Sequence, residues 1–394
     1  MRSMNLAILC AVQVSLLLAG QLKGETARRL VVGSGGSDCP AATFTSIQDA
    51  VNHASPGTEI HVCAGIYTEG VQITIPLTVT ADPGATLMPQ YLLPNATSLA
   101  TGSPLAAILS VEGTSDVSVS GLVVDGGLAS INECLPNLIG VLFQNSSGKI
   151  AHTIVRNTML APSLNGCQSG LGIFVQSGNG GQSKVTIAEN RVGGYQKNGI
   201  TANEVGTDAD ICDNTVTGLG PTSGAAQNGI QIGFGATGKV RGNFVTDHIW
   251  SPCAEDDECE FFSTGILVEQ SDGIELADNV VGNNQDNIYV QGNNCEIERN
   301  QVYSSVVLNG IQVAGDNCHV EENRIAHSTL ASIAFLGNDT LVRRNILVDA
   351  EVGILKFFGS LNSDIDRNRF IDIGDDVVDP RPVSLGATAN PARD

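Results

Sequence analysis

Residues 276–281 read Leu-Ala-Asp-Asn-Val-Val, and residues 297–302 read Ile-Glu-Arg-Asn-Gln-Val. In both segments an aliphatic residue lies three positions before an Asn, and an apolar residue lies two positions after it. The same frame occurs nine times along the second two-thirds of the chain, at Asn157, Asn190, Asn214, Asn243, Asn279, Asn300, Asn323, Asn345 and Asn368. A recurring frame of this kind is typical of repeat architectures and has to be interpreted before any single motif.

The spacing of the repeat predicts an all-β protein built as a right-handed parallel β-helix. The last five Asn residues of the frame are 21 to 23 residues apart, and earlier steps reach 36. Each unit carries a second apolar pair with the alternation of a strand, such as Ile288 and Val290. A short unit cannot bury its apolar face alone, so units must stack. Roughly ten to twelve coils at about 4.8 Å each would make a rod about 50 Å long.

The frame also predicts which side chains point inward. We expect the nine Asn side chains to lie above one another at a bend, each amide bonding to the next and satisfying backbone groups there. His152, five positions before Asn157, is then expected in the core. Cys295 and Cys318 occupy that same position on adjacent coils, where they either form a disulfide or fill the core.

The chain is expected to be one domain with processed and flexible ends. Residues 1–24 have the short basic start and apolar stretch of a signal peptide. Residues 31–375 form the predicted β-helix, with a capping helix at 43–55, and 376–394 form a flexible C-terminal tail. No other segment has the roughly 18 apolar residues that cross a bilayer. We therefore expect a secreted protein, extracellular or periplasmic, and a monomer.

The cysteines fit export, because disulfides persist in oxidising compartments. Cys39 and Cys63 both lie near the start of the mature chain, and Cys253 and Cys259 share one loop. Cys134 and Cys167 fall in loops of successive coils and are suited to join them by a disulfide.

The net charge of −21 disfavours a nucleic-acid partner, which requires a basic face. An anionic polysaccharide would need a bridging cation such as Ca²⁺. The acidic run at residues 255–260 supplies hard oxygen ligands for Ca²⁺, although their spacing matches no known calcium motif. No other metal or cofactor is predicted.

The insertions in the repeat all fall at one corner of the coil. Loops at about 159–171, 217–228 and 246–264, and one near 125–137, lie between the Asn and the second apolar pair of their units. The coil between the first two of these loops is short and carries Tyr195 and Lys197. This arrangement predicts a notch with Tyr195 and Lys197 at its floor, and function in rods of this kind resides on such loops.

The largest loop carries the chemistry-bearing residues Asp247, His248 and Trp250. The ring of Trp250, the only Trp, either stacks on a sugar or folds down onto the rod as a local core. His248 is the candidate acid or base near neutral pH. For hydrolysis, Asp247 and Glu269 are the candidate carboxylates; for lyase or epimerase chemistry, Lys197 with Tyr195 or His248 would serve.

Outward positions of the second strand form a polar row that suits glycan binding. Besides Glu269, its members are Thr201, Asn203, Gln231, Tyr289, Gln291 and Gln312. The row either lines a groove for a sugar chain or forms a solvated sheet face.

Three N-terminal segments resemble the opening of a known superfamily. These are Phe44-Thr-Ser-Ile-Gln-Asp-Ala-Val51, Gly57-Thr-Glu-Ile-His-Val62 and Gly65-Ile-Tyr-Thr-Glu-Gly-Val-Gln-Ile73. They are similar to the start of pectin-lyase-like β-helix proteins, and the later Asn frame resembles the carbohydrate-binding and sugar-hydrolysis repeats of that superfamily, including NosD-type proteins. The resemblance covers roughly residues 31–375. The motifs of mannuronan epimerases, pectin methylesterases and polygalacturonases are absent from the sequence, so no specific enzyme family is matched.

Two functions remain open from the sequence. One is an exported β-helix that binds and processes a polysaccharide as a lyase, hydrolase or epimerase. The other is a non-catalytic surface or periplasmic rod, NosD-like or adhesive. They differ in whether Tyr195, Lys197, His248 and Glu269 converge on one point.

Overall fold

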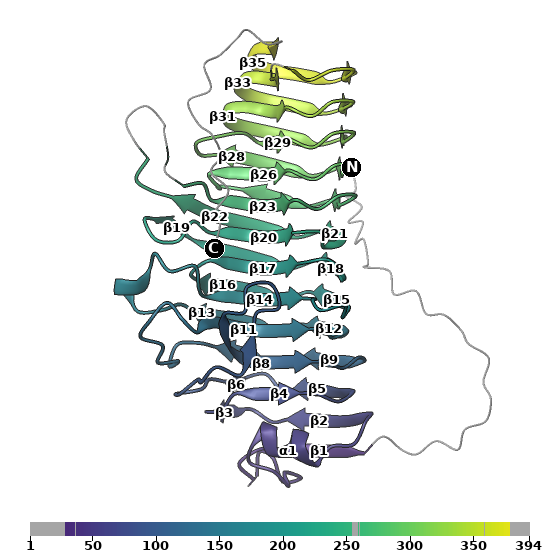
Figure 1. Ribbon diagram of the computed structural model, residues 1–394. Helices are drawn as coiled ribbons and strands as arrows, with labels where there is room; N and C mark the ends of the chain where they lie inside the picture. Colours follow the sequence, from purple (N-terminus) through teal and green to yellow (C-terminus); the bar gives the residue numbers. More distant parts are fainter. Residues whose placement is uncertain (1–27, 36, 254–258, 260, 358, 379–394) are drawn as a thin grey trace, which may run out of the picture.

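A computed structural model describes residues 28–35, 37–253, 259, 261–357 and 359–378. These residues wind into a right-handed coil of parallel strands, which runs from the purple N-terminal end to the yellow end in Figure 1. The expected signal peptide and the tail beyond residue 378 lie outside the described residues. Among the described residues, no helix is long and apolar enough to cross a membrane.

The first face of the coil is a parallel sheet of 13 strands, one more than the upper limit of ten to twelve coils expected from the sequence. In stacking order they are β1 (Arg29–Val32), β2 (Thr58–Val62), β5 (Leu77–Ala81), β9 (Val117–Ser120), β12 (Gly148–Ala151), β15 (Ser183–Ala188), β18 (Thr207–Cys212), β21 (Thr237–Arg241), β24 (Glu275–Ala277), β27 (Glu296–Glu298), β30 (His319–Glu321), β32 (Leu341–Arg343) and β34 (Asp364–Asp366).

The remaining 22 strands form the second and third faces. The second face contains β3 (Gly65–Tyr67), β6 (Ala85–Leu87), β10 (Val123–Asp125), β13 (Ile154–Thr158), β16 (Arg191–Tyr195), β19 (Thr215–Thr222), β22 (Phe244–Trp250), β25 (Val280–Gly282) and β28 (Gln301–Ser305). The third contains β4 (Val71–Ile73), β8 (Pro104–Glu112), β11 (Asn137–Gln144), β14 (Leu171–Gln176), β17 (Asn198–Asn203), β20 (Asn228–Gly233), β23 (Thr264–Glu269), β26 (Asp286–Val290) and β29 (Ile311–Val313). Three long strands, β31 (Arg324–Phe335), β33 (Ile346–Lys356) and β35 (Arg369–Val378), run along both faces, and β7 (Ala96–Thr97) pairs antiparallel with β8.

The core consists of columns of stacked aliphatic side chains. On the first face, Ile187 pairs with Ile150 below it and Ile211 above it, and all three are fully buried. The apolar pairs predicted for the third face stack in the same manner, as Ile266 does on Ile288. Equivalent positions therefore fill the interior at every level, as the repeat predicted.

A ladder of Asn side chains holds the bend between the first and second faces. In each step, the side-chain oxygen of one Asn accepts hydrogen bonds from the backbone N–H and the side-chain amide of the Asn one coil earlier. Asn300 Oδ1, for example, accepts from Asn279 N at 3.0 Å and from Asn279 Nδ2 at 3.0 Å. The ladder runs unbroken from Asn190 to Asn368.

The assignment of Asn157 to this ladder was wrong. The residue below Asn190 is Thr153, whose backbone N–H donates to Asn190 Oδ1 at 3.0 Å. Asn157 is exposed, and its amide donates to Asp125 Oδ1 at 2.8 Å. The sequence around Asn157 matches the frame by coincidence, four positions out of register. For the same reason His152 is not in the core: its side chain is 57% exposed and lies 3.4 Å from Glu189 Oε2.

The residue before each ladder position has a left-handed backbone. Its φ lies between 50° and 67° at His152, Glu189, Asp213, Gly242, Asp278, Arg299, Glu322, Arg344 and Arg367. Only one of these residues is a glycine, although the conformation costs other residues about 1–2 kcal/mol. The hydrogen bonds of the adjacent ladder Asn offset this cost from Asn190 onward, and His152 is instead followed by Thr153, whose backbone N–H donates to Asn190.

Three of the predicted disulfide pairings are present: Cys39–Cys63, Cys134–Cys167 and Cys253–Cys259. Cys295 and Cys318 are free and buried, so they fill the core instead of bonding to each other. These disulfides fit an extracellular or periplasmic protein.

The predicted N-terminal helix exists as α1 (Ile47–His53), shorter than the expected 43–55. Ser46 is its N-cap, and Ile47, Ala50 and Val51 are buried in the same core as β2. Figure 1 shows α1 beside β1 at the purple end of the coil. Its role as a cap against edge pairing stays a prediction. At the other end β35 continues to Val378, three residues into the expected tail.

Replacing one ladder residue tests how much the ladder stabilises the coil. Asn300→Ala removes the acceptor of two Asn279 donors and the donor to Leu276 O at 2.8 Å, all of them buried. We expect the free energy of unfolding, measured by urea titration, to fall by about 3 kcal/mol. Asn52→Ala, on the exposed side of α1, is the matched control and should change it by about 0.5 kcal/mol or less. Equal losses in both variants would contradict a stabilising ladder.

Candidate functional site

The long loops leave the coil at one corner, between the second and third faces, as predicted. They connect β10 to β11, β13 to β14, β19 to β20 and β22 to β23. In Figure 1 the loops from β10 to β11 and from β13 to β14 project from the left side of the rod. Residues 254–258 and 260, which include most of the acidic run considered for Ca²⁺, lie outside the described residues.

Two of these loops close over the short coil between them, so the expected notch is filled. Gln196 donates to Leu164 O at 2.7 Å and to Cys167 O at 3.0 Å in the earlier loop. Lys197 Nζ donates to Ala226 O at 2.7 Å in the later loop. The loops also bond to each other across the coil. The expected floor is therefore covered by backbone of both loops.

Beneath the loops lies a buried polar cluster formed by Tyr195, His248 and Asn284. The hydroxyl of Tyr195 forms a hydrogen bond with His248 Nε2, and the two rings stack with centroids 5.9 Å apart. His248 Nδ1 lies 2.7 Å from Asn284 Oδ1. His248 and Asn284 are 0% exposed and Tyr195 is 1% exposed. The sequence predicted Tyr195 at the floor of an open notch and His248 in a loop, and left open whether the two converge.

The hydrogen bonds of Asn284 fix the protonation of His248. Asn284 Nδ2 donates to Gly282 O at 3.1 Å and to Asn287 Oδ1 at 2.9 Å, so its oxygen faces the imidazole. His248 Nδ1 therefore carries the proton and Nε2 accepts from Tyr195. Burial lowers the pKa of His248 to about 4, partly opposed by the hydrogen bond to Asn284. Both ring nitrogens are used, so the acid–base role expected of His248 has no free nitrogen in this conformation.

Trp250 belongs to a local core, the alternative that the sequence left open. Its ring is 7% exposed, and Nε1 donates to Gly224 O at 3.1 Å. Phe261 packs edge-on against it with centroids 5.4 Å apart. The ring faces protein on both sides, so it does not offer a stacking surface to a sugar here.

The remaining candidate catalytic residues do not converge. Asp247 lies within β22 on the second face, so it is not in the loop expected at 246–264. Glu269 ends β23 on the third face, roughly 17 Å along that strand from the corner at which the loop joins it. Lys197, whose pKa is lowered to about 8 by burial, is held by the loop carbonyl of Ala226.

The polar row on the outer side of the third face is covered in its early coils. The segment around β7 lies over β11 and β14: Leu99 N donates to Gln176 Oε1 at 2.9 Å, and Gln144 Nε2 donates to Thr97 O at 2.8 Å. In the next two coils Thr201 is 1% and Gln231 8% exposed. Gln231 Nε2 bonds to Asn203 Oδ1 at 3.2 Å, so these three predicted binding residues lie in a self-satisfied network.

Further along, the same row opens into a half-exposed patch. We call Leu267, Glu269, Tyr289, Gln291 and Gln312 the Tyr289 patch. Tyr289 is paired between Leu267 and Gln312, with Gln291 two positions along its own chain. Burial is the main cause that raises the pKa of Tyr289, and the carboxyl groups of Asp286 and Glu269 raise it further. Burial also raises the pKa of Glu269.

Asp286 is a functional candidate that the sequence analysis missed. It is 2% exposed at the start of β26, and its Oδ1 has no hydrogen-bond partner. Burial raises its pKa well above the ordinary value, which disfavours the ionised form of the carboxyl group. The sequence feature that could have pointed to Asp286 is the run Asn283-Asn-Gln-Asp-Asn287. These are five polar residues where other coils have glycine and apolar residues.

Comparison with known proteins places the fold. The sequence profile of the NosD family, described as periplasmic copper-binding protein, matches residues 222–379, less than half of the chain. The chain has the fold of the pectin-lyase-like β-helix proteins. No curated protein sequence matches it.

Solved structures support the same fold. The GH136 lacto-N-biosidase from Eubacterium ramulus has a TM-score of 0.59 and 12% sequence identity, covering 87% of this chain and 68% of its own. PfbA, a surface adhesin of Streptococcus pneumoniae, has a TM-score of 0.52 and 15% identity, covering 87% of this chain and 91% of its own. At these identities the likeness concerns the fold alone.

The part of the chain that matches the NosD profile was tested for copper ligands. Both nitrogens of its buried His248 are hydrogen-bonded, and His327 Nδ1 is 2.7 Å from Asp349 Oδ2. Among the described residues, the group of three His, Cys, Asp or Glu that converges is His61, Cys63 and Asp82, outside the matched segment. The described residues of 222–379 therefore hold no such converging group of three.

The pH dependence of stability tests the buried state of His248. Its folded pKa of about 4 lies below the unfolded value near 6.5, so the unfolded chain takes up a proton that the folded chain cannot. Stability is full above pH 6.5, and the free energy of unfolding should fall by roughly 3 kcal/mol towards pH 4.

Comparison of variants isolates this contribution from that of the carboxyl groups. Urea titrations of His248→Gln between pH 4 and 7 should show a shallower decline than the wild type. His319→Gln, at an exposed histidine, is the control and should keep the wild-type slope. An unchanged slope in His248→Gln would show that the histidine is not buried in its neutral form.

Proposed function

We propose that the protein is an exported β-helix that binds a neutral glycan along the outer side of its third face, at the Tyr289 patch. The observation that carries the proposal is the half-exposed phenol of Tyr289 between amide and carboxyl side chains. An aromatic ring with adjacent hydrogen-bonding groups suits the apolar face and the hydroxyl groups of a sugar. Parallel strands repeat about every 4.8 Å, which offers a sugar chain several equivalent levels.

The charge of the protein supports a neutral ligand. The patch carries Glu269 and no cationic side chain, and the whole chain has a net charge of −21. A uronic-acid polymer would be repelled without a bridging cation. Neutral oligosaccharides are thus the substrate class to test first. The adhesin among the structures of similar fold is consistent with a binding role on a β-helix of this size.

Processing of the glycan is the second candidate, favoured by the raised pKa of Glu269 beside the patch. A protonated carboxyl group can act as a general acid, but hydrolysis also needs an ionised carboxylate within about 5–10 Å. The nearby Asp286 is buried, and burial raises its pKa, which disfavours the ionised form. The described geometry thus favours binding, and the solved lacto-N-biosidase keeps hydrolysis of a neutral glycan as the alternative.

Binding to a panel of neutral and uronic-acid oligosaccharides, measured by calorimetry, tests the proposal. We expect a neutral glycan to bind and Tyr289→Ala to weaken it roughly ten-fold, equivalent to about 1.4 kcal/mol. Tyr91→Ala, at an 84% exposed tyrosine elsewhere, should leave the affinity unchanged. Binding that is insensitive to Tyr289→Ala would remove the patch as the site.

The same samples distinguish binding from processing. Release of new reducing ends by the wild type, lost in Glu269→Gln, would establish the second candidate. We expect binding without release, because an ionised carboxylate partner for Glu269 is missing from the described patch.

A further inference from the structure

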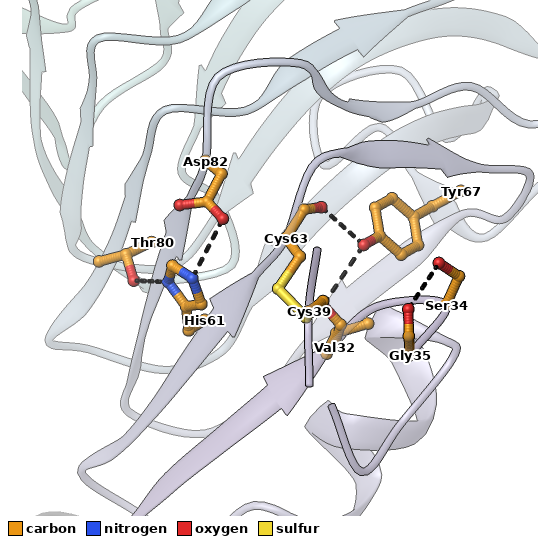
Figure 2. Close-up of a disulfide and its surroundings, with 9 residues drawn as sticks. All are labelled: Val32, Ser34, Gly35, Cys39, His61, Cys63, Tyr67, Thr80 and Asp82. Carbon is orange, nitrogen blue, oxygen red and sulfur yellow. Dashed lines mark hydrogen bonds and ion pairs between the residues drawn. A yellow bond between two sulfur atoms is a disulfide. The ribbon is translucent and has the colours of Figure 1, made fainter. Parts of the chain in front are cut away.

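Three metal-ligating side chains converge at the N-terminal end of the coil, outside the Tyr289 patch. His61 and Cys63 come from the end of β2, and Asp82 follows β5 on the next coil (Figure 2). One potential ligand atom from each lies within 4.8 Å of the other two. His61 Nε2 is 3.4 Å from Asp82 Oδ2. Cys63 is bonded to Cys39, which Figure 2 shows on the side of Cys63 away from Asp82.

We propose that His61, Cys63 and Asp82 form a Zn²⁺ site that the Cys39–Cys63 disulfide blocks and that reduction opens. A sulfur in a disulfide carries no negative charge and is a poor metal ligand, whereas the thiolate is a strong one. An imidazole nitrogen, a thiolate and a carboxylate are ligands that Zn²⁺ accepts in tetrahedral sites. The Cys39 thiolate, released beside Cys63, is the fourth ligand.

The coil holds these ligands close to the required spacing. In a tetrahedral site with bonds of about 2.0–2.3 Å, ligand atoms are roughly 3.3–3.8 Å apart, so side-chain movements of about 1 Å are sufficient. The pairing of β2 with β5 fixes the backbone, since Asp82 N donates to Val62 O at 2.8 Å. Tyr67 Oη donates to Cys63 O at 2.7 Å and holds the cysteine from the other side.

Two of the three ligands are partly exposed, so an ion can reach the site from solvent. Cys63 is 6% exposed, but the side chains of His61 and Asp82 are 21% and 45% exposed. The thiolate would therefore lie at the bottom of the site and the carboxylate at its rim. Thr80 Oγ1, 3.5 Å from His61 Nδ1, orients the ring so that Nε2 remains directed at Asp82.

Reduction of the Cys39–Cys63 disulfide, which opens the site, requires a dithiol as reductant. The dithiol supplies two electrons and two protons, the Cys39–Cys63 bond breaks to two thiols, and the dithiol becomes a cyclic disulfide. Binding of Zn²⁺ then releases the two thiol protons to solvent. This proposal does not rest on the proposed glycan binding, because the two sites share no residue.

The test uses the full chain with Cys39→Ser, which frees the Cys63 thiol without a reductant and leaves the other disulfides intact. Co²⁺ is the probe, because thiolate–Co²⁺ charge transfer absorbs in the near ultraviolet. We expect this variant to bind one Co²⁺ with a charge-transfer band and Zn²⁺ to displace it. The oxidised wild type should show no band.

Further substitutions in the Cys39→Ser background identify the ligands. Adding Cys63→Ser should abolish the band, and adding His61→Asn should weaken Co²⁺ binding at least about ten-fold. Adding His319→Asn, at an exposed histidine on another coil, is the matched control and should change nothing. Circular dichroism confirms that each variant is folded.

The wild type supplies an independent measurement if a variant fails to fold. After treatment with a dithiol and removal of the reductant, it should gain a Co²⁺ charge-transfer band that adding His61→Asn weakens, which separates this site from thiols released at the other disulfides. Absence of a band in both the folded Cys39→Ser variant and the reduced wild type would overturn the proposal. Equal affinity with and without His61→Asn would also overturn it.

Discussion

The hydrogen bonds of the Asn ladder are the constraint on which the rest of this structure depends. The side-chain amide nitrogen of a ladder Asn such as Asn300 donates upward to the oxygen of the next ladder Asn and downward to a strand carbonyl, so a change in its position would break contacts on two levels. The bend between the first and second faces accordingly has the same length in every ladder coil, with two residues between β15 and β16 as between β32 and β33. Insertions are excluded there and accumulate at the corner between the second and third faces.

The corner between the second and third faces tolerates insertions, and this tolerance explains why polar side chains lie inside the coil beneath it. Gly199 and Gly229 leave room inside the coil, and a Cβ on them would come within 2.9 Å of Tyr195 and 2.8 Å of His248 respectively. The two rings occupy this space because Tyr195 bonds to His248 and His248 bonds to Asn284. A buried polar group is tolerated only when it is hydrogen-bonded. The loops supply the remaining bonds, and the result is a packed corner instead of an open notch.

This difference shows what the sequence could predict. The repeat period predicted the strands, the columns of inward side chains and the corner at which the loops leave the coil. Each of these follows from the stacking of equivalent positions. The period could not show whether a loop folds outward or back onto the coil, which depends on contacts such as Trp250 with Gly224. The frame also could not distinguish Asn157 from Thr153, since both have an aliphatic residue three positions before them. For the candidate site, Glu269, Tyr289 and Gln291 were found by strand alternation, whereas Asp286 required knowledge of burial.

The ladder also determines where the few positive charges lie. The residue before a ladder Asn is an arginine in three coils, and two of these arginines pair with an acidic residue one coil below: Arg299 with Asp278 at 3.1 Å and Arg344 with Glu322 at 2.9 Å. Such exposed pairs stabilise little, but they neutralise cations at a bend away from the third face. Among the described residues of the Tyr289 patch there is consequently no cation to receive a carboxylate or sulfate. An outer surface with hydroxyl, amide and carboxyl groups can bond to sugar hydroxyls, and its uncompensated negative charge selects against acidic sugars. The same regular stacking that builds the rod is consistent with the neutral glycan that we propose for its third face.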